Sequence, residues 1–158
     1  MIREMLGIAE GILQDLHNDH SEVATLIDRI METNDAGERD ALFDEMKTKL
    51  LAHSKAEEEV FYRALENSAN RESRNFVGEA ANEHDTVERQ LQKMSAGDKV
   101  TDTWTAELTR LRDLVEHHVD EEESTGFSCA RDDFSKDELE AMAPRFQERK
   151  QELMLSIG

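Results

Sequence analysis

The sequence has little of several residue types on which other architectures depend. Among its 158 residues are one proline, one cysteine and seven glycines, and aromatic residues make up 5% of the chain. The lone cysteine, Cys129, cannot form an internal disulfide or a sulfur-rich metal cage. The scarcity of aromatic residues, glycine and proline disfavours sheets and turn-rich folds, whereas the abundant alanine, leucine, glutamate, arginine and lysine favour helices. The composition therefore predicts an all-α protein.

Basic residues and long apolar runs are also scarce. Lysine and arginine number 19 against 37 aspartates and glutamates, which gives a net charge of −18 at pH 7. Such an acidic chain repels phosphate backbones and anionic lipid headgroups, so neither nucleic acid nor a membrane is an expected partner. The first residues form no apolar stretch of signal-peptide length, and no segment approaches the roughly 20 apolar residues of a membrane span. We therefore expect a cytoplasmic protein.

Apolar residues recur at helical spacing along the whole chain, which has the length of a single domain over residues 1–158. We predict four long helices over residues of about 3–33, 36–67, 70–94 and 102–125, and a short fifth helix over about 136–156. Capping signals mark three of these starts: Asp35 with Glu38, Thr101 or Asp102, and Ser135 with Glu138. Short connections between long helices favour an up-down-up-down four-helix bundle, with the C-terminal fifth helix packed on it as an accessory element.

Two of the long helices carry a histidine followed four residues later by a glutamate. These pairs are His53 with Glu57 and His118 with Glu122. Residues four apart lie on the same helix face, so each pair can present a nitrogen and a carboxylate to one ion. Both pairs fall in phase with the apolar stripe of their helix, which should face the core.

The other two long helices each carry one histidine in phase with their apolar residues. These two histidines, His20 and His84, should therefore also face the core. A core with four histidines and two glutamates would be costly to bury unless metal ions neutralised it. The sequence therefore predicts a site for two metal ions. Imidazole and carboxylate ligands suit iron, manganese or zinc. The predicted ligands are His20, His53, Glu57, His84, His118 and Glu122.

The order of these six residues resembles that of the hemerythrin-like HHE cation-binding domains. The residues around them, at 18–20, 51–62 and 115–123, are similar to the segments that surround the ligands of that family, and the resemblance covers residues of about 12–150. It implies a non-haem centre of two iron ions (Fe²⁺/Fe³⁺), bridged by oxygen or carboxylate. It also makes iron the expected metal, with zinc and manganese as alternatives.

The resemblance implies binding of, or reaction with, a small ligand: dioxygen, nitric oxide or hydrogen peroxide. Sensing and peroxide removal are the expected roles, the second as a catalase-like activity and the first with a regulatory protein partner. The alternatives are storage or delivery of iron, or a regulatory helical bundle with a structural metal. The fold is common to these roles and does not choose among them.

Some features of the sequence leave the ligand set open. His117 is followed four residues later by Glu121, which repeats the spacing of the pair beside it, although phase favours His118. Glu88, four residues after His84, could be a seventh ligand or could orient an imidazole. The third helix has one inward histidine where the oxygen-carrying hemerythrins have a pair, which weakens an oxygen-carrier role.

Overall fold

The computed structural model describes residues 10–157 of the chain. In chain order its helices are α2 (Ile12–Glu32), α3 (Ala36–Glu57), the π-helical turn η1 (Glu58–Tyr62), α4 (Arg63–Glu66), α5 (Arg71–Met94), α6 (Asp102–Glu121), a second π-helical turn η2 (Glu122–Gly126), α7 (Phe127–Asp133) and α8 (Lys136–Ile157). The described part of the chain contains no strand, so the all-α prediction is confirmed.

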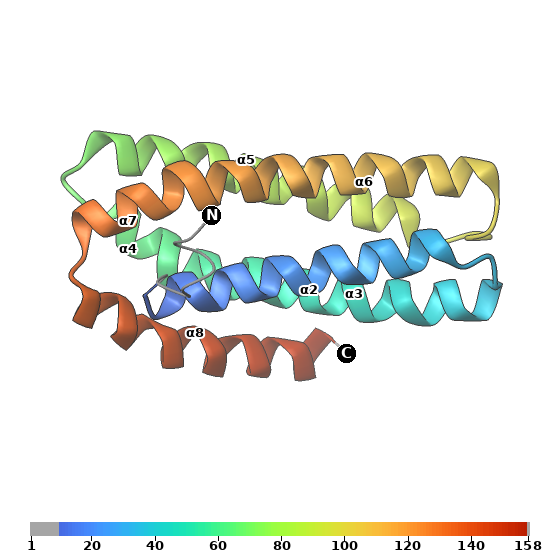
Figure 1. The fold of residues 1–158 in the computed structure, drawn as a ribbon, viewed down its shortest axis with the longest axis horizontal. Helices are drawn as coiled ribbons and strands as arrows, with labels where there is room; N and C mark the ends of the chain where they lie inside the picture. The colour runs from blue at the N-terminus through green and yellow to red at the C-terminus, as the bar shows by residue number, and fades with distance from the viewer. Residues whose placement is uncertain (1–9, 158) are drawn as a thin grey trace.

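Four long helical segments lie side by side and form a helical bundle (Figure 1). They are α2, α3 continued by η1 and α4, α5, and α6 continued by η2 and α7. Figure 1 shows the α2–α3 and α5–α6 connections at one end of the bundle and the α4–α5 and α7–α8 connections at the other. Segments that follow one another in the sequence therefore run in opposite directions.

The helix starts depend on local capping. The Asp35 carboxylate accepts a hydrogen bond from the Glu38 backbone N–H, and the Thr101 hydroxyl accepts the N–H three residues later. At the start of α8 the Ser135 hydroxyl accepts the Glu138 N–H while the Glu138 carboxylate accepts the Ser135 N–H, a complete capping box. All three capping signals in the sequence are confirmed, with Thr101 rather than Asp102 as the cap of α6.

The first helix begins later than predicted. Residues 3–9 of the expected helix lie outside the described residues, but α2 itself starts at Ile12, after Gly11. Gly11 has a φ of 48°, a conformation that L side chains rarely adopt, and a Cβ there would lie 2.3 Å from the backbone oxygen of Leu139 in α8. A helix running unbroken through residues 10 and 11 was therefore a wrong prediction, because the chain turns where it meets α8.

The fourth segment does not end near Gly126 as predicted, but continues through η2 and α7 to Asp133. Gly126 lies within helical backbone, and a Cβ there would come within 2.6 Å of the Phe76 ring on α5. The glycine thus permits close packing between η2 and α5 and does not stop the helix. Sequence alone suggested a stop because glycine is more common after helices than inside them.

The predicted bounds of the fifth helix agree with α8, but this helix is not short. It contains 22 residues, the same number as α3, and runs unbroken through Pro144. It packs against α2 and α3 along one side of the bundle (Figure 1). Phe146 is fully buried there.

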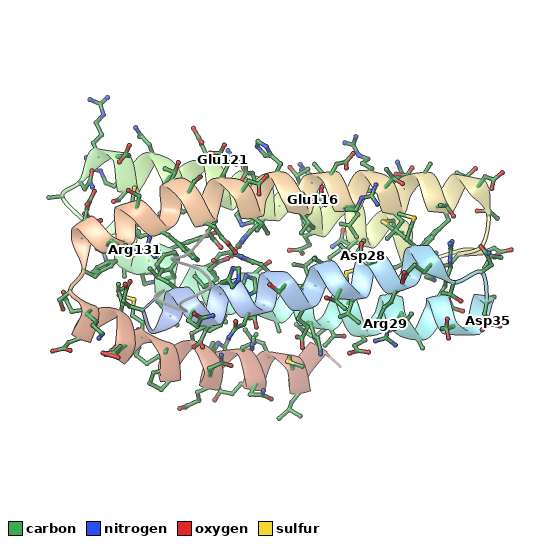
Figure 2. All side chains as sticks on the ribbon, in the orientation of Figure 1. Asp28, Arg29, Asp35, Glu116, Glu121 and Arg131 are labelled. Carbon is green, nitrogen blue, oxygen red and sulfur yellow. The ribbon has the colours of Figure 1, made fainter. Side chains whose placement is uncertain are left out.

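The apolar core has two halves. One half, near the α4–α5 and α7–α8 connections, contains Phe61, Tyr62 and Phe127, and the other contains Phe43 and Trp104. Between them lie the buried histidines and glutamates described below. Charged side chains cover the outside of the bundle (Figure 2). No helix in the described chain combines the length and the apolar composition that a membrane span requires.

Candidate metal centre

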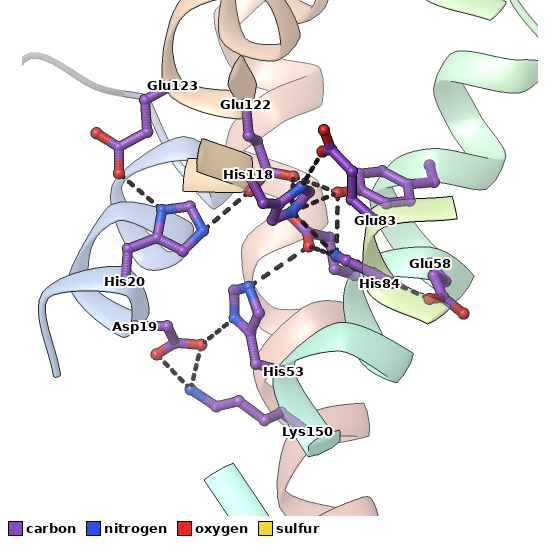
Figure 3. Close-up of polar contacts among 12 residues, drawn as sticks. Asp19, His20, His53, Glu58, Glu83, His84, His118, Glu122, Glu123 and Lys150 are labelled. Carbon is purple, nitrogen blue, oxygen red and sulfur yellow. Dashed lines mark hydrogen bonds and ion pairs between the residues drawn. The ribbon is translucent and has the colours of Figure 1, made fainter. Parts of the chain in front are cut away.

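The structure brings all six predicted ligand residues together in the middle of the bundle. The four histidines are each at most 7% exposed, and the two glutamates are fully buried. They come from four different helical segments, as Figure 3 shows. The residues that helical spacing places on the inward faces of these segments thus lie in one layer, and this layer separates the two apolar halves of the core.

The ligand atoms form two groups that share a carboxylate. One group consists of His20, His53, Glu57 and Glu122, and in it all ligand atoms lie within 4.8 Å of one another. Glu57, His84 and His118 form the second group by the same measure. The Glu57 Oε1 atom lies 3.4 Å from His53 Nε2 and 3.2 Å from His84 Nε2, so it stands between the groups.

Glu122 also faces both groups, one oxygen to each. Its Oε1 lies 3.0 Å from His20 Nε2, and its Oε2 lies 3.7 Å from His118 Nε2. Each group therefore has two imidazole nitrogens and access to two shared carboxylates. These side chains, contributed by four helical segments, could hold a pair of cations in the core of the bundle.

The directions of these atoms fit metal ions better than hydrogen bonds within the protein. In the described structure, the buried His20 Nε2, His53 Nε2, both Glu57 oxygens and Glu122 Oε1 have no hydrogen-bond partner, although nitrogens and oxygens lie close together. A buried polar atom without a partner costs about 1–3 kcal/mol. Cations placed between these atoms would satisfy all of them, so the donor set fits two metal ions.

Each histidine is oriented by a carboxylate at its other ring nitrogen. The four Nδ1 contacts, drawn in part in Figure 3, are His53 with Asp19 at 2.8 Å, His20 with Glu123 at 2.7 Å, His84 with Glu58 at 2.7 Å and His118 with Glu83 at 2.7 Å. A carboxylate that accepts the Nδ1 proton fixes the tautomer with a bare Nε2, which is the form that binds a metal. All four imidazoles are thus prepared as Nε2 ligands.

These four carboxylates follow a simple rule along the chain. Each is the immediate sequence neighbour of a predicted ligand, and each contacts a histidine on another helical segment. Asp19 on α2 orients His53 on α3, and Glu58 on η1 orients His84 on α5. Glu83 on α5 orients His118 on α6, and Glu123 on η2 orients His20 on α2. The contacts therefore close a ring around the bundle. The sequence analysis did not predict these carboxylates, although each stands next to a predicted ligand in the chain.

The pKa values of three of the histidines reflect the negative charge around them. Burial alone would lower the pKa of His20 and of His53, but the neighbouring carboxylates outweigh it and raise both pKa values to about 9. In the same way Glu57 and Glu58 raise the pKa of His84 to about 10 against burial. Without metal, protons on the imidazoles would take the place of the cations that the carboxylates demand.

The two shared carboxylates are not electrostatically equivalent. Burial raises the pKa of Glu57, but attraction to His53 together with contacts to Glu122 and His84 outweighs it and holds that pKa well below the usual range. Burial and the charge of Glu57 raise the pKa of Glu122. Glu57, which stands between the two groups, therefore keeps its negative charge.

Tyr62 adds a phenol oxygen to the second group. Its Oη lies 3.3 Å from His84 Nε2 and 3.3 Å from His118 Nε2, and it donates a short hydrogen bond to Glu122 Oε2. Burial and the nearby carboxylates raise the pKa of this phenol well above its usual value. The side chain belongs to η1, and π-helical turns of this kind often occur at functional sites because they re-aim side chains.

The comparison with known proteins agrees with this geometry. Residues 11–130 match the hemerythrin HHE cation binding domain family, which is about three quarters of the chain. The chain belongs to this family. A hemerythrin HHE cation binding domain-containing protein from Mycobacterium kansasii has the same fold, with a TM-score of 0.74 and 24% identity, covering 89% of this chain and 85% of that one.

One curated relative of this HHE domain has a much longer chain. A protein named DNA nickase from Nostoc sp. is 28% identical over 152 residues, which cover 92% of this chain and 41% of the relative. The chain thus spans about two fifths of the length of that relative.

The structure also places the residues that the sequence left open. The His117 side chain is 66% exposed and contacts Glu83 at the surface, so it lies outside both groups. Glu88 lies outside both groups too, on the wall of a surface pocket between α3 and α5. His17, one helical turn before His20, was not among the predicted ligands; it is 38% exposed, contacts Glu123 at 3.0 Å and also lies outside both groups.

The side of the histidine layer away from the glutamates is aliphatic. One helical turn from each histidine, towards the end that holds the α2–α3 connection, lie Val23, Leu50, Val87 and Val115. Together with the four imidazoles they line a cavity of about 20 Å³. Such a volume holds about one water-sized molecule.

Proposed function

We propose that this HHE domain holds two iron ions and that these bind or react with dioxygen, nitric oxide or hydrogen peroxide, in sensing or in peroxide removal. The observation that carries the proposal is the pair of ligand groups that share Glu57 and Glu122. In this proposal the ligands are His20, His53, Glu57, His84, His118 and Glu122, and the domain is a single up-down-up-down bundle over residues 1–158 with α8 packed on it.

Iron is favoured over zinc and manganese by the donor set together with the family. Imidazole and carboxylate donors suit all three metals. The Tyr62 phenol, placed within reach of the second group, adds a hard oxygen donor that favours the ferric state. Bound iron would supply the redox chemistry, and the protein would supply the geometry and a shielded pocket.

The surroundings of the centre support a small ligand. The carboxylates hold the centre on one side, and the aliphatic cavity lies on the other side, next to all four imidazoles. A cavity of about 20 Å³ excludes organic substrates of ordinary size. Its valine and leucine walls also keep bulk water away from the reacting ligand.

The name of the Nostoc relative does not lead us to propose DNA cleavage for this chain. Most of that relative lies outside the matched region, and the net charge of −18 here opposes approach to a phosphate backbone. We propose no nucleic acid or membrane partner, and a cytoplasmic location. A sensing role would need a regulatory protein partner.

Elemental analysis of freshly purified protein, with its visible absorption spectrum before and after addition of peroxide, tests the proposal. We expect about two irons per chain and a charge-transfer band that changes with peroxide. Steady turnover of peroxide would favour peroxide removal, and stoichiometric binding would favour sensing. Zinc, a single metal or no metal would contradict the proposal. Rapid release of iron to a chelator without redox change would point to storage or delivery.

A further inference from the structure

The aliphatic cavity beside the metal centre lies close to the surface between α3 and α5. Between α3 and α5 is a surface pocket of about 230 Å³. Four residues line both this surface pocket and the inner cavity: Leu50, Ser54, His84 and Val87. Only a wall one side chain thick therefore separates the solvent from the space next to the imidazoles.

We propose that small uncharged ligands reach the metal centre through this wall, passing Ser54 and Val87 between α3 and α5. The proposal rests on the proposed function, because it concerns the route to the same centre. It assigns to Ser54 and Val87 the control of which molecules arrive and how fast.

A second surface pocket approaches the cavity from the other side but is closed by charges. It has a volume of about 280 Å³, lies beside α2, α3 and α8, and shares Asp19 and Val23 with the inner cavity. The Asp19 carboxylate accepts two hydrogen bonds from Lys150, at 2.8 and 3.0 Å, and contacts His53 Nδ1 at 2.8 Å. A ligand arriving there would have to separate an ion pair that also orients a metal ligand.

The wall between α3 and α5 contains one such contact, between His84 Nδ1 and Glu58 at 2.7 Å, but Glu58 lines the outer pocket alone and does not stand between that pocket and the cavity. Leu50 and Val87 are aliphatic, and Ser54 is small and half-buried, so side-chain rotation and helix breathing can open a passage at little cost. The charged residues around the outer pocket are Lys55, Glu58, Asp85 and Glu88. Three acids against one base disfavour anions, so the route selects neutral molecules such as nitric oxide, dioxygen or hydrogen peroxide.

The test uses the iron-loaded full chain, reduced without oxygen and mixed rapidly with nitric oxide. Two variants add the same leucine side chain, Ser54→Leu in the proposed wall and Asn18→Leu in the second pocket. Neither residue binds metal. For Ser54→Leu we expect association and dissociation of nitric oxide to slow at least tenfold by the same factor, with an unchanged Kd and an unchanged iron content. Asn18→Leu should behave as the wild type.

Equal slowing in both directions identifies a barrier on the route, because a change at the binding site itself would alter the Kd. Val87→Ala removes two methyl groups from the wall and should speed both rates, which keeps the test available if Ser54→Leu folds poorly. Slowing by Asn18→Leu alone, or wild-type rates in Ser54→Leu and Val87→Ala, would overturn the route. A wild-type protein with two irons that binds neither nitric oxide nor dioxygen and does not react with hydrogen peroxide would overturn the proposed function as well.

Discussion

Removal of the metal should make the stability of the protein depend strongly on pH. In the metal-free protein the neighbouring carboxylates raise the pKa of His20 from 6.5 to about 9. A histidine whose pKa is higher in the folded state stabilises that state fully below pH 6.5, and the stabilisation disappears as the pH rises through 9. A difference of this size corresponds to about 3 kcal/mol for His20 alone. The pKa values of His53, about 9, and of His84, about 10, are raised as well, so these two histidines also stabilise the folded state less as the pH rises.

The three effects do not add, because the histidines share Glu57 and Glu122. A loss of about 3 kcal/mol would still be a large part of the stability of about 5–15 kcal/mol that is usual for a domain. The assay is urea unfolding of metal-free and metal-loaded protein at several pH values between 6.5 and 9. General repulsion among the acidic residues affects both forms, so the difference between them isolates the site.

We expect the metal-loaded form to gain at least about 3 kcal/mol over the metal-free form as the pH rises across this range, since protons then compete less with the metal. A difference that stays constant, or that narrows with rising pH, would refute the reasoning. It would mean that the buried imidazoles do not carry protons in place of the metal.

Further substitutions test individual contacts. Glu57→Gln removes the charge between the two ligand groups and should lower the metal content from two ions to at most one, measured by elemental analysis; an unchanged content would show that Glu57 does not bridge. Asp19→Asn should weaken metal binding about 10–100-fold in a chelator competition, because it loosens the orientation of His53. Tyr62→Phe should keep the fold but shift the visible absorption of the ferric protein, and an identical spectrum would exclude a phenol contact with iron. His117→Ala is the matched control, and all three measurements should remain as in the wild type.

The meeting of the six proposed ligand residues in one layer could be predicted from the sequence, because each lies in phase with the apolar residues of its helix. Helical phase decides which residues of an amphipathic helix face the core, and four helices in one bundle bring their inward faces together. Phase also distinguished His118 from His117, which the structure places at the surface.

The orienting carboxylates could not be predicted in the same way. Their partners lie on other helices, so the pairing depends on the rotation of one helix against its neighbour, which spacing within a helix does not reveal. Glu58 is an example, since from sequence it is one of several acidic residues, and only the fold shows its contact with His84.

The two π-helical turns were also missed. Each comes directly at a His-x-x-x-Glu pair, and η1 carries Tyr62 to the second ligand group. An extra residue in a helical turn leaves no mark in the pattern of apolar residues over so short a stretch. Similarly, the role of Gly126 depends on the closeness of the Phe76 ring, a contact between distant parts of the chain.

The measurement that tests the central claim most directly is anomalous diffraction from crystals of the purified protein, recorded on both sides of the iron absorption edge. We predict two iron peaks, one beside His20 and His53 and one beside His84 and His118, both in contact with Glu57. A single peak, or no peak among these side chains, would contradict the claim that the HHE centre holds two iron ions.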